Sequence, residues 1–120
     1  MNNRKVSGNQ NEVLAVKFLQ KKNYKIITRN YYQRCGEVDI IAEKNQVIVF
    51  VEVKSLSTEV FRKLEESVSW AKRNRILKTA LFWLLENGKS NCDWRVDYIG
   101  INCEHGIIRR ILHIENIISG

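Results

Sequence analysis

One run of the sequence, VIVFVEVK at residues 47–54, constrains the fold more than any other. Apolar residues occupy both the odd and the even positions of this run, so both faces of an extended segment would be apolar. A strand of that kind is normally central in its sheet. The run therefore predicts a buried central strand, and the rest of the chain must supply layers that cover its two faces.

The surrounding sequence alternates between helical and extended patterns. Apolar residues at helical spacing predict a helix over residues 10–22 and a second from Ser67 or Ser69 to Glu86, with Asn87-Gly88 as its stop signal. Period-two patterns predict strands over residues 24–34, 37–42, 46–54, 93–102 and 107–114. This order predicts an α/β fold, a sandwich in which a central mixed β-sheet is flanked by helices.

The chain has the length of one domain, with 120 residues of which 44% are hydrophobic. Residues 1–8 are expected to form a flexible basic N-terminus, and residues 9–118 a single domain. The formal net charge of +7 favours polyanionic partners, although generic solubility is the alternative explanation.

Cysteine usage and hydropathy indicate the compartment. The three cysteines have neither a disulfide-framework nor a metal-ligand spacing, which fits a reducing environment. The first residues lack the apolar core of a signal peptide, and no apolar stretch approaches the length of a membrane span. A cytoplasmic protein without membrane contact is expected.

Charged residues interrupt the apolar pattern at one end of the central strand. Glu52 and Lys54 share a face with Ile48 and Phe50, while the four valines of the run cover the other face. A two-residue turn at Lys44-Asn45 would join this strand to the preceding one and bring Asp39 close to Glu52. Two carboxylates so placed repel each other unless a cation lies between them.

Carboxylate oxygens with open coordination positions suit Mg²⁺ or Mn²⁺. Lys54 could then orient or deprotonate an attacking water and balance the developing charge. The alternative is a simple ion pair of Lys54 with Glu52 or Asp39 at the end of the sheet, which leaves the second acid uncompensated.

Glu12 is a further candidate from the first helix. On a helical wheel it lies within the apolar arc, between Ala15, Val16 and Leu19. The helix dipole explains an acid in the first turn, but not one on the core-facing side. We therefore expect Glu12 to belong to the same site.

The second helix has a basic side opposite its core stripe, formed by Lys72, Arg75 and Lys78. These residues could contact phosphates near the helix N-terminus or simply be solvated. Phe82 and Trp83 flank the core stripe, where they could pack under a strand or form a dimer contact. Further along the chain, Arg95 and Asp97 alternate on one strand face and are expected to be structural, paired with each other or with a neighbour.

The ordered set of motifs resembles the YraN family of small bacterial endonuclease-like proteins, within the PD-(D/E)xK nuclease superfamily. The resemblance spans about residues 8–118. It rests on six segments of the sequence: Gly8 to Leu19 with Glu12, Arg29-Asn30-Tyr31, Gly36-Glu37-Val38-Asp39-Ile40-Ile41, Phe50-Val51-Glu52-Val53-Lys54, the spaced set Val68, Lys72, Arg75 and Ala80, and Arg95-Val96-Asp97.

The resemblance implies a restriction-endonuclease-like fold and a metal-dependent DNA endonuclease. By it Asp39, Glu52 and Lys54 correspond to the superfamily's D…(D/E)xK set, Glu12 to its extra helix acid, and the Val53 carbonyl to a further ligand of Mg²⁺ or Mn²⁺. The archaeal Holliday-junction resolvases are similar, so a homodimer would favour branched DNA. The alternative is a non-catalytic nucleic-acid-binding or DNA-repair scaffold protein that retains the nuclease fold.

Overall fold

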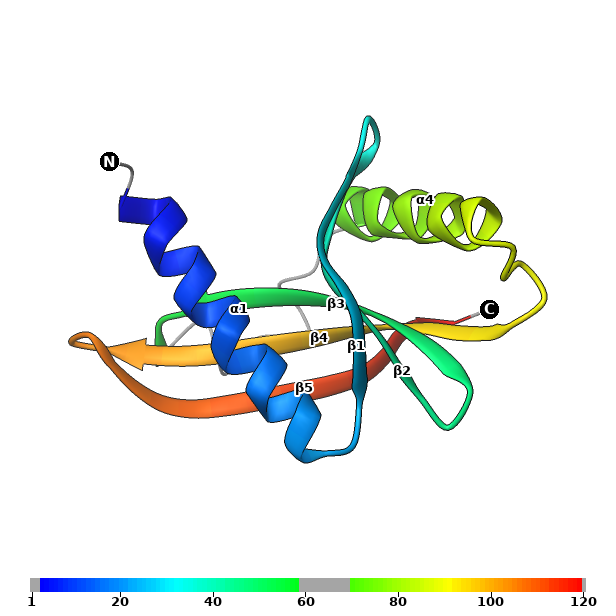
Figure 1. Cartoon of the computed structure of the whole chain (residues 1–120). Helices are drawn as coiled ribbons and strands as arrows, with labels where there is room; N and C mark the ends of the chain where they lie inside the picture. The colour runs from blue at the N-terminus through cyan, green and yellow to red at the C-terminus, as the bar shows by residue number, and fades with distance from the viewer. Residues whose placement is uncertain (1–2, 59–69, 120) are drawn as a thin grey trace.

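The computed structural model describes the backbone of residues 3–58 and 70–119, and the side chains of residues 10–58 and 73–118. The elements follow the order α1 (Asn3–Lys21), β1 (Lys25–Gln33), β2 (Gly36–Lys44), β3 (Val47–Leu56), α4 (Trp70–Glu86), β4 (Asp93–Glu104) and β5 (Ile107–Ser119). This is the predicted α/β order, and Figure 1 shows the strands lying between the two helices. Ser67 and Ser69, the predicted caps of the second helix, lie outside the described residues.

The five strands form one sheet in the sequential order β1-β2-β3-β4-β5. The β3–β4 pair is parallel and the other three pairs are antiparallel, which confirms the mixed sheet. Antiparallel neighbours need only short turns, whereas the parallel pair requires a crossover, and α4 lies in that crossover. The strand β3 is therefore central, as the run at residues 47–54 predicts.

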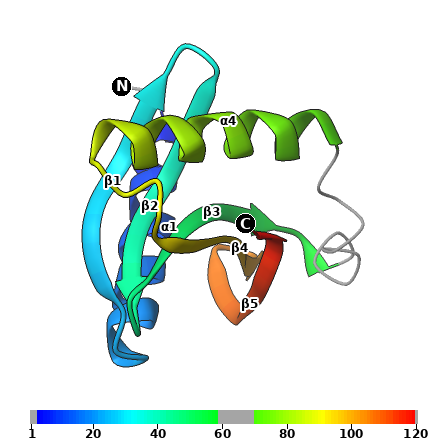
Figure 2. The ribbon, with the colours of Figure 1, turned by 90° about the vertical axis from the view of Figure 1, so that its right-hand side faces the viewer.

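Alternate side chains of β3 enter two different cores. Val49 and Val51 pack toward α1, against Ala15 and Leu19. The opposite face of the sheet packs against α4, which contributes Ile76, Ala80, Trp83 and Leu84 to the second core. The residues of that core are Ile48 and Phe50 of β3 with Val38, Ile41, Val96, Ile76, Ala80, Trp83 and Leu84. Figure 2 shows α4 crossing the strands on the side away from α1.

Both helices end in hydrogen-bonded caps that the sequence encodes. After α4 the Lys89 N–H donates to the Leu84 carbonyl at 2.8 Å and the Gly88 N–H to the Leu85 carbonyl at 3.2 Å. Gly88 has φ 65°, the left-handed conformation that this cap requires, so the predicted stop signal is confirmed. Asn23, with φ 70°, occupies the same position after α1.

Several boundaries of helices and strands differ from the sequence prediction. The first helix begins at Asn3, within the segment expected to be a flexible lead-in, and its first turns extend beyond the sheet (Figure 1). The final strand continues to Ser119 rather than ending at residue 114. The β2–β3 turn consists of Asn45 and Gln46, not Lys44 and Asn45, because Lys44 pairs with Val47.

A buried polar network fixes β5 against β4. Asp97 is fully buried, and its carboxylate accepts hydrogen bonds from Arg95 Nε at 2.9 Å, the Asn116 N–H at 2.9 Å and His113 Nε2 at 2.7 Å. Burial alone would raise the pKa of Asp97, but these hydrogen bonds together hold it below its usual value. The predicted structural pairing of Arg95 with Asp97 is confirmed.

No helix within residues 3–58 and 70–119 combines the length and the apolar character that a membrane crossing requires.

Candidate functional site

The site lies where β2 and β3 separate. Their backbone pairing runs from the turn as far as Ile40 opposite Val51 and then stops. One position further, Asp39 uses its side chain instead, and its Oδ2 accepts a hydrogen bond from the Val53 N–H at 2.7 Å. This contact holds Asp39 beside Glu52, the neighbour predicted for it, at the open end of the β2–β3 pair.

A distortion in β1 accompanies this separation. Arg29 pairs with Ile40 and Tyr31 with Val38, so Asn30 lies next to Asp39 on the adjacent strand. Asn30 has φ 54°, in the left-handed region, which interrupts the pleat. Asparagine tolerates this conformation better than other non-glycine residues, which gives one physical reason for an asparagine here.

Burial and mutual repulsion raise the proton affinity of Asp39. Burial, followed by the negative charge of Glu52 and smaller effects of Glu12 and Glu37, raises its pKa from 3.8 to about 7. The hydrogen bond from the Val53 N–H opposes these effects. Glu52 is itself 9% exposed. Two desolvated carboxylates therefore face each other, which is unfavourable unless a proton or a cation reduces their charge.

Glu12 approaches the same place from α1. The Asn30 amide faces it, and in the orientation that satisfies both groups Nδ2 donates to the two carboxylate oxygens at 2.6 and 3.2 Å. Burial raises the pKa of Glu12, Arg29 opposes the shift, and the charges of Glu37 and Glu52 add to it. Glu12 thus lies within electrostatic reach of Glu52.

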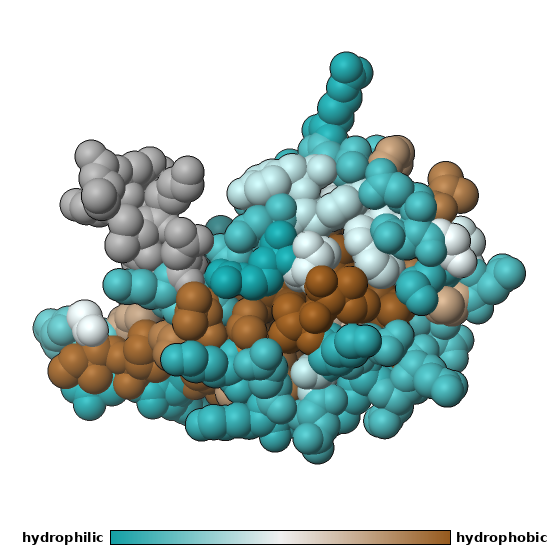
Figure 3. Space-filling model, viewed as in Figure 1, coloured by the Kyte–Doolittle hydropathy of each residue, from teal (hydrophilic) through white to brown (hydrophobic). Residues whose placement is uncertain are grey.

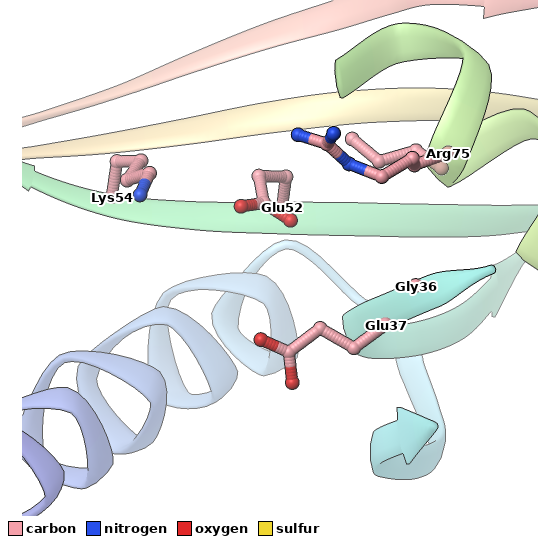
Figure 4. A pocket seen from close by; sticks show the side chains of 6 residues that line it. Gly36, Glu37, Glu52, Lys54 and Arg75 are labelled. Atoms are coloured by element: carbon pink, nitrogen blue, oxygen red, sulfur yellow. The ribbon is translucent and has the colours of Figure 1, made fainter. Parts of the chain in front are cut away.

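A cavity of about 240 Å³ opens beside these acids on the α4 side of the sheet. It is lined by Gly36, Glu37, Glu52, Lys54, Arg75 and Ile76. Figure 4 shows Glu52 and Lys54 on β3, with the Arg75 guanidinium directed from α4 toward Glu52. The cavity therefore places two cationic side chains next to the buried acid.

Gly36 allows α4 to approach this cavity closely. A Cβ at Gly36, which has φ 154°, would lie 3.3 Å from both Arg75 Cβ and Thr79 Oγ1. Cys35 adds a contact of 3.4 Å between its Sγ and Thr79 Oγ1. The tip of the β1–β2 hairpin thus packs on α4 and fixes the position from which Arg75 reaches the cavity.

Two of the three predicted basic residues of the second helix have described side chains, and one of these two lies at the site. Arg75 lines the cavity, whereas Lys78 is exposed and does not. The side chain of Lys72 lies outside the described residues. Of Phe82 and Trp83, Trp83 packs under the sheet against Phe50, while Phe82 remains 46% exposed.

Sequence reasoning did not select Glu37, Arg29 or Asn30. Glu37 lines the cavity, and Figure 4 shows its side chain extending from β2 toward α1. Its two-residue spacing from Asp39 was the available signal, since such residues share a strand face. Arg29 and Asn30 belong to a motif of the family resemblance, but their proximity to Glu12 depends on the local distortion of β1, which the motif does not show.

The carboxylates of this site are compatible with a hard divalent cation that takes only one or two of its ligands from the protein. Among the described side chains, no group of three or more His, Cys, Asp or Glu is arranged to hold a metal ion. Mg²⁺, however, retains several waters and is often held by only one or two carboxylates together with substrate phosphates. Asp39 and Glu52 fit that description, because they are two neighbouring carboxylates at the open end of the β2–β3 pair.

Comparisons with known proteins agree on one family. The model of the uncharacterised protein family UPF0102 matches residues 11–101. A UPF0102 protein of Sulfurihydrogenibium sp. (strain YO3AOP1) is 42% identical over 105 residues, covering 88% of this chain and 87% of its own length. One from Clostridioides difficile (strain 630) is 40% identical over 114 residues, with coverages of 95% and 97%. One from Vibrio campbellii is 38% identical over 114 residues, with coverages of 93% and 91%.

Proposed function

This chain belongs to the UPF0102 family, also called the YraN family, and we propose that it is a metal-dependent endonuclease that hydrolyses phosphodiester bonds in DNA. One observation carries the proposal. The desolvated pair Asp39 and Glu52 stands at the open end of two strands, beside a cavity lined by Lys54 and Arg75. An acid pair kept at such an electrostatic cost, with cations next to it, is characteristic of a functional site rather than of packing.

Asp39 and Glu52 would hold Mg²⁺ or Mn²⁺, with Glu12 assisting directly or through water and the Val53 carbonyl as a further ligand. When bound, such an ion polarises a phosphoryl oxygen and activates water. The raised pKa of Asp39 supports this assignment, because a cation would replace the proton that relieves its repulsion with Glu52.

The two cationic side chains that line the cavity, Lys54 and Arg75, have separate roles. Lys54 lies two residues from Glu52 on the same strand face, where its ammonium group positions the attacking water and balances the charge of the pentacoordinate phosphate. Arg75 approaches from the other wall, and its planar guanidinium suits two-point contact with a phosphate. The net charge of +7 adds a general attraction for the DNA backbone.

A cleavage assay tests the proposal. The substrates are end-labelled linear, flapped, four-way-junction and single-stranded DNA, each incubated with Mg²⁺ or Mn²⁺. The wild type should cut at least one of them, whereas Asp39→Asn, Glu52→Gln and Lys54→Met should lower the rate by about 10²-fold or more. Glu43→Gln, near the other end of β2, is the matched control and should leave cleavage unchanged.

Binding measured in parallel separates an enzyme from a scaffold protein that retains the fold. The enzyme predicts that Asp39→Asn and Glu52→Gln bind DNA within a few-fold of the wild type while cleavage is lost. Arg75→Met should weaken DNA binding. It should also lower the slope of the logarithm of the binding constant against the logarithm of the salt concentration by about one unit. A wild type that cuts none of these DNAs with either metal, yet binds them in a salt-dependent manner, would refute the enzyme and favour the scaffold.

A further inference from the structure

The outward face of α4 carries three large apolar side chains that the fold does not cover. Leu81 and Phe82 are each 46% exposed and Leu85 is 71% exposed. Residues three and four positions apart lie on one side of a helix, so these three form a single stripe. Figure 3 shows hydrophobic atoms among hydrophilic ones over the C-terminal end of α4. This apolar stripe is separate from the Arg75 cavity and has no role in the proposed chemistry.

One basic and one acidic side chain flank the apolar stripe, each four residues from Phe82. Lys78 lies four residues before Phe82 and Glu86 lies four residues after it, and both are exposed. Glu86 accepts a hydrogen bond from the Tyr31 hydroxyl at 3.2 Å, which fixes its carboxylate near the helix. The face is thus ordered as positive charge, apolar stripe, negative charge.

This order is complementary to itself when a second helix runs antiparallel. In a two-fold pair centred on Phe82, Lys78 of each copy lies opposite Glu86 of the other, and the apolar stripes meet between them. A parallel pair would instead place like charges together. From this pattern we propose that α4 is a homodimer interface in which the two copies of the helix pack antiparallel about Phe82.

The dimensions of α4 set the strength of this dimer. Its 17 residues extend over about 26 Å, so a single helix pair buries an area at the small end of specific interfaces. The dimer is therefore weak and depends on concentration. The two Arg75 side chains are separated by fourteen residue positions in the antiparallel register, or about 21 Å along the axis. The interface does not depend on whether the site cuts DNA.

Sedimentation velocity across a range of protein concentrations tests the interface. The wild type should shift from monomer toward dimer as concentration rises, and Leu85→Lys should remain monomeric while keeping its circular dichroism spectrum and melting temperature. Ile107→Lys, at a 56% exposed isoleucine on β5, is the control and should dimerise like the wild type. A wild type that stays monomeric at its highest soluble concentration, or an Ile107→Lys variant that alone loses the dimer, overturns the proposal.

Charge reversal tests the antiparallel register and does not depend on the apolar variant. Lys78→Glu and Glu86→Lys each place like charges together in their own homodimers, which should weaken association about tenfold or more. Mixing the two variants in equal amounts should restore dimerisation, because the mixed pair regains both ion pairs. Equal association of the single variants and their mixture would refute this register.

Discussion

Replacing Asp39 by asparagine should stabilise the metal-free protein at neutral to alkaline pH. Burial and the charge of Glu52 raise the pKa of Asp39 from 3.8 to about 7 in the folded state, so the folded protein holds a proton that the unfolded chain has released. Between about pH 4 and 7 the folded state therefore binds more protons, and the free energy of unfolding falls as the pH rises.

The shift of about three units corresponds to about 4 kcal/mol, at 1.36 kcal/mol per unit. Because a strongly interacting carboxyl delivers only part of its nominal shift as stability, we expect a measured loss of about 2–4 kcal/mol between pH 4 and 8. Asparagine carries no charge at either pH, and its side-chain oxygen can still accept the hydrogen bond from the Val53 N–H. The variant should match the wild type near pH 4 and exceed its stability at pH 8 by a similar 2–4 kcal/mol.

Urea denaturation in EDTA measures this difference, with tryptophan fluorescence as the signal, since Trp83 is buried against Phe50. Asp93→Asn, an exposed acid at the start of β4, is the control and should follow the wild type at both pH values. The reasoning would be refuted by wild-type stability that does not fall between pH 5 and 8, together with an Asp39→Asn variant less stable than the wild type at pH 8.

Three further substitutions test other parts of the account. Asp97→Asn leaves Arg95 and His113 without their buried carboxylate and should lower the free energy of unfolding by about 3–5 kcal/mol; a loss under 1 kcal/mol would contradict the assigned network. Gly36→Ala places a methyl group 3.3 Å from Arg75 Cβ and should cost about 1–3 kcal/mol and weaken DNA binding, whereas unchanged binding would show that the approach of α4 is not needed. Gln46→Gly removes a non-glycine residue at φ 68° in the β2–β3 turn and should stabilise the protein by about 0.5–1 kcal/mol, and a destabilised variant would be inconsistent with that turn.

The two-faced character of β3 was predictable because its residues satisfy a strict period of two. Val49 and Val51 enter one core and Ile48 and Phe50 the other, as the pattern requires. The core-facing position of Glu12 was predictable for the same reason, since helical periodicity fixes the side of α1 on which it lies. Periodicity therefore identified the acids and the faces that carry them.

Other features depend on contacts that sequence does not display. The turn at Asn45 and Gln46 contains no glycine to mark it, so the packing of β2 on β3 decides its position. The continuation of β5 beyond residue 114 depends on the hydrogen bond from the Asn116 N–H to Asp97, a partner distant in the sequence. The first turns of α1 lie beyond the sheet and have no apolar face to bury, so their sequence shows no helical repeat of apolar residues that would predict them.

The central claim is that Asp39 and Glu52 form a divalent-cation site, and calorimetric titration of Mn²⁺ into DNA-free protein tests it most directly. The account predicts saturable binding to the wild type and to the Asp93→Asn control at pH 8, and weaker binding below pH 7, where a proton on Asp39 competes with the cation. Asp39→Asn and Glu52→Gln should each lose most of this affinity. Absence of binding to the wild type, or equal binding to all four proteins, would contradict the claim.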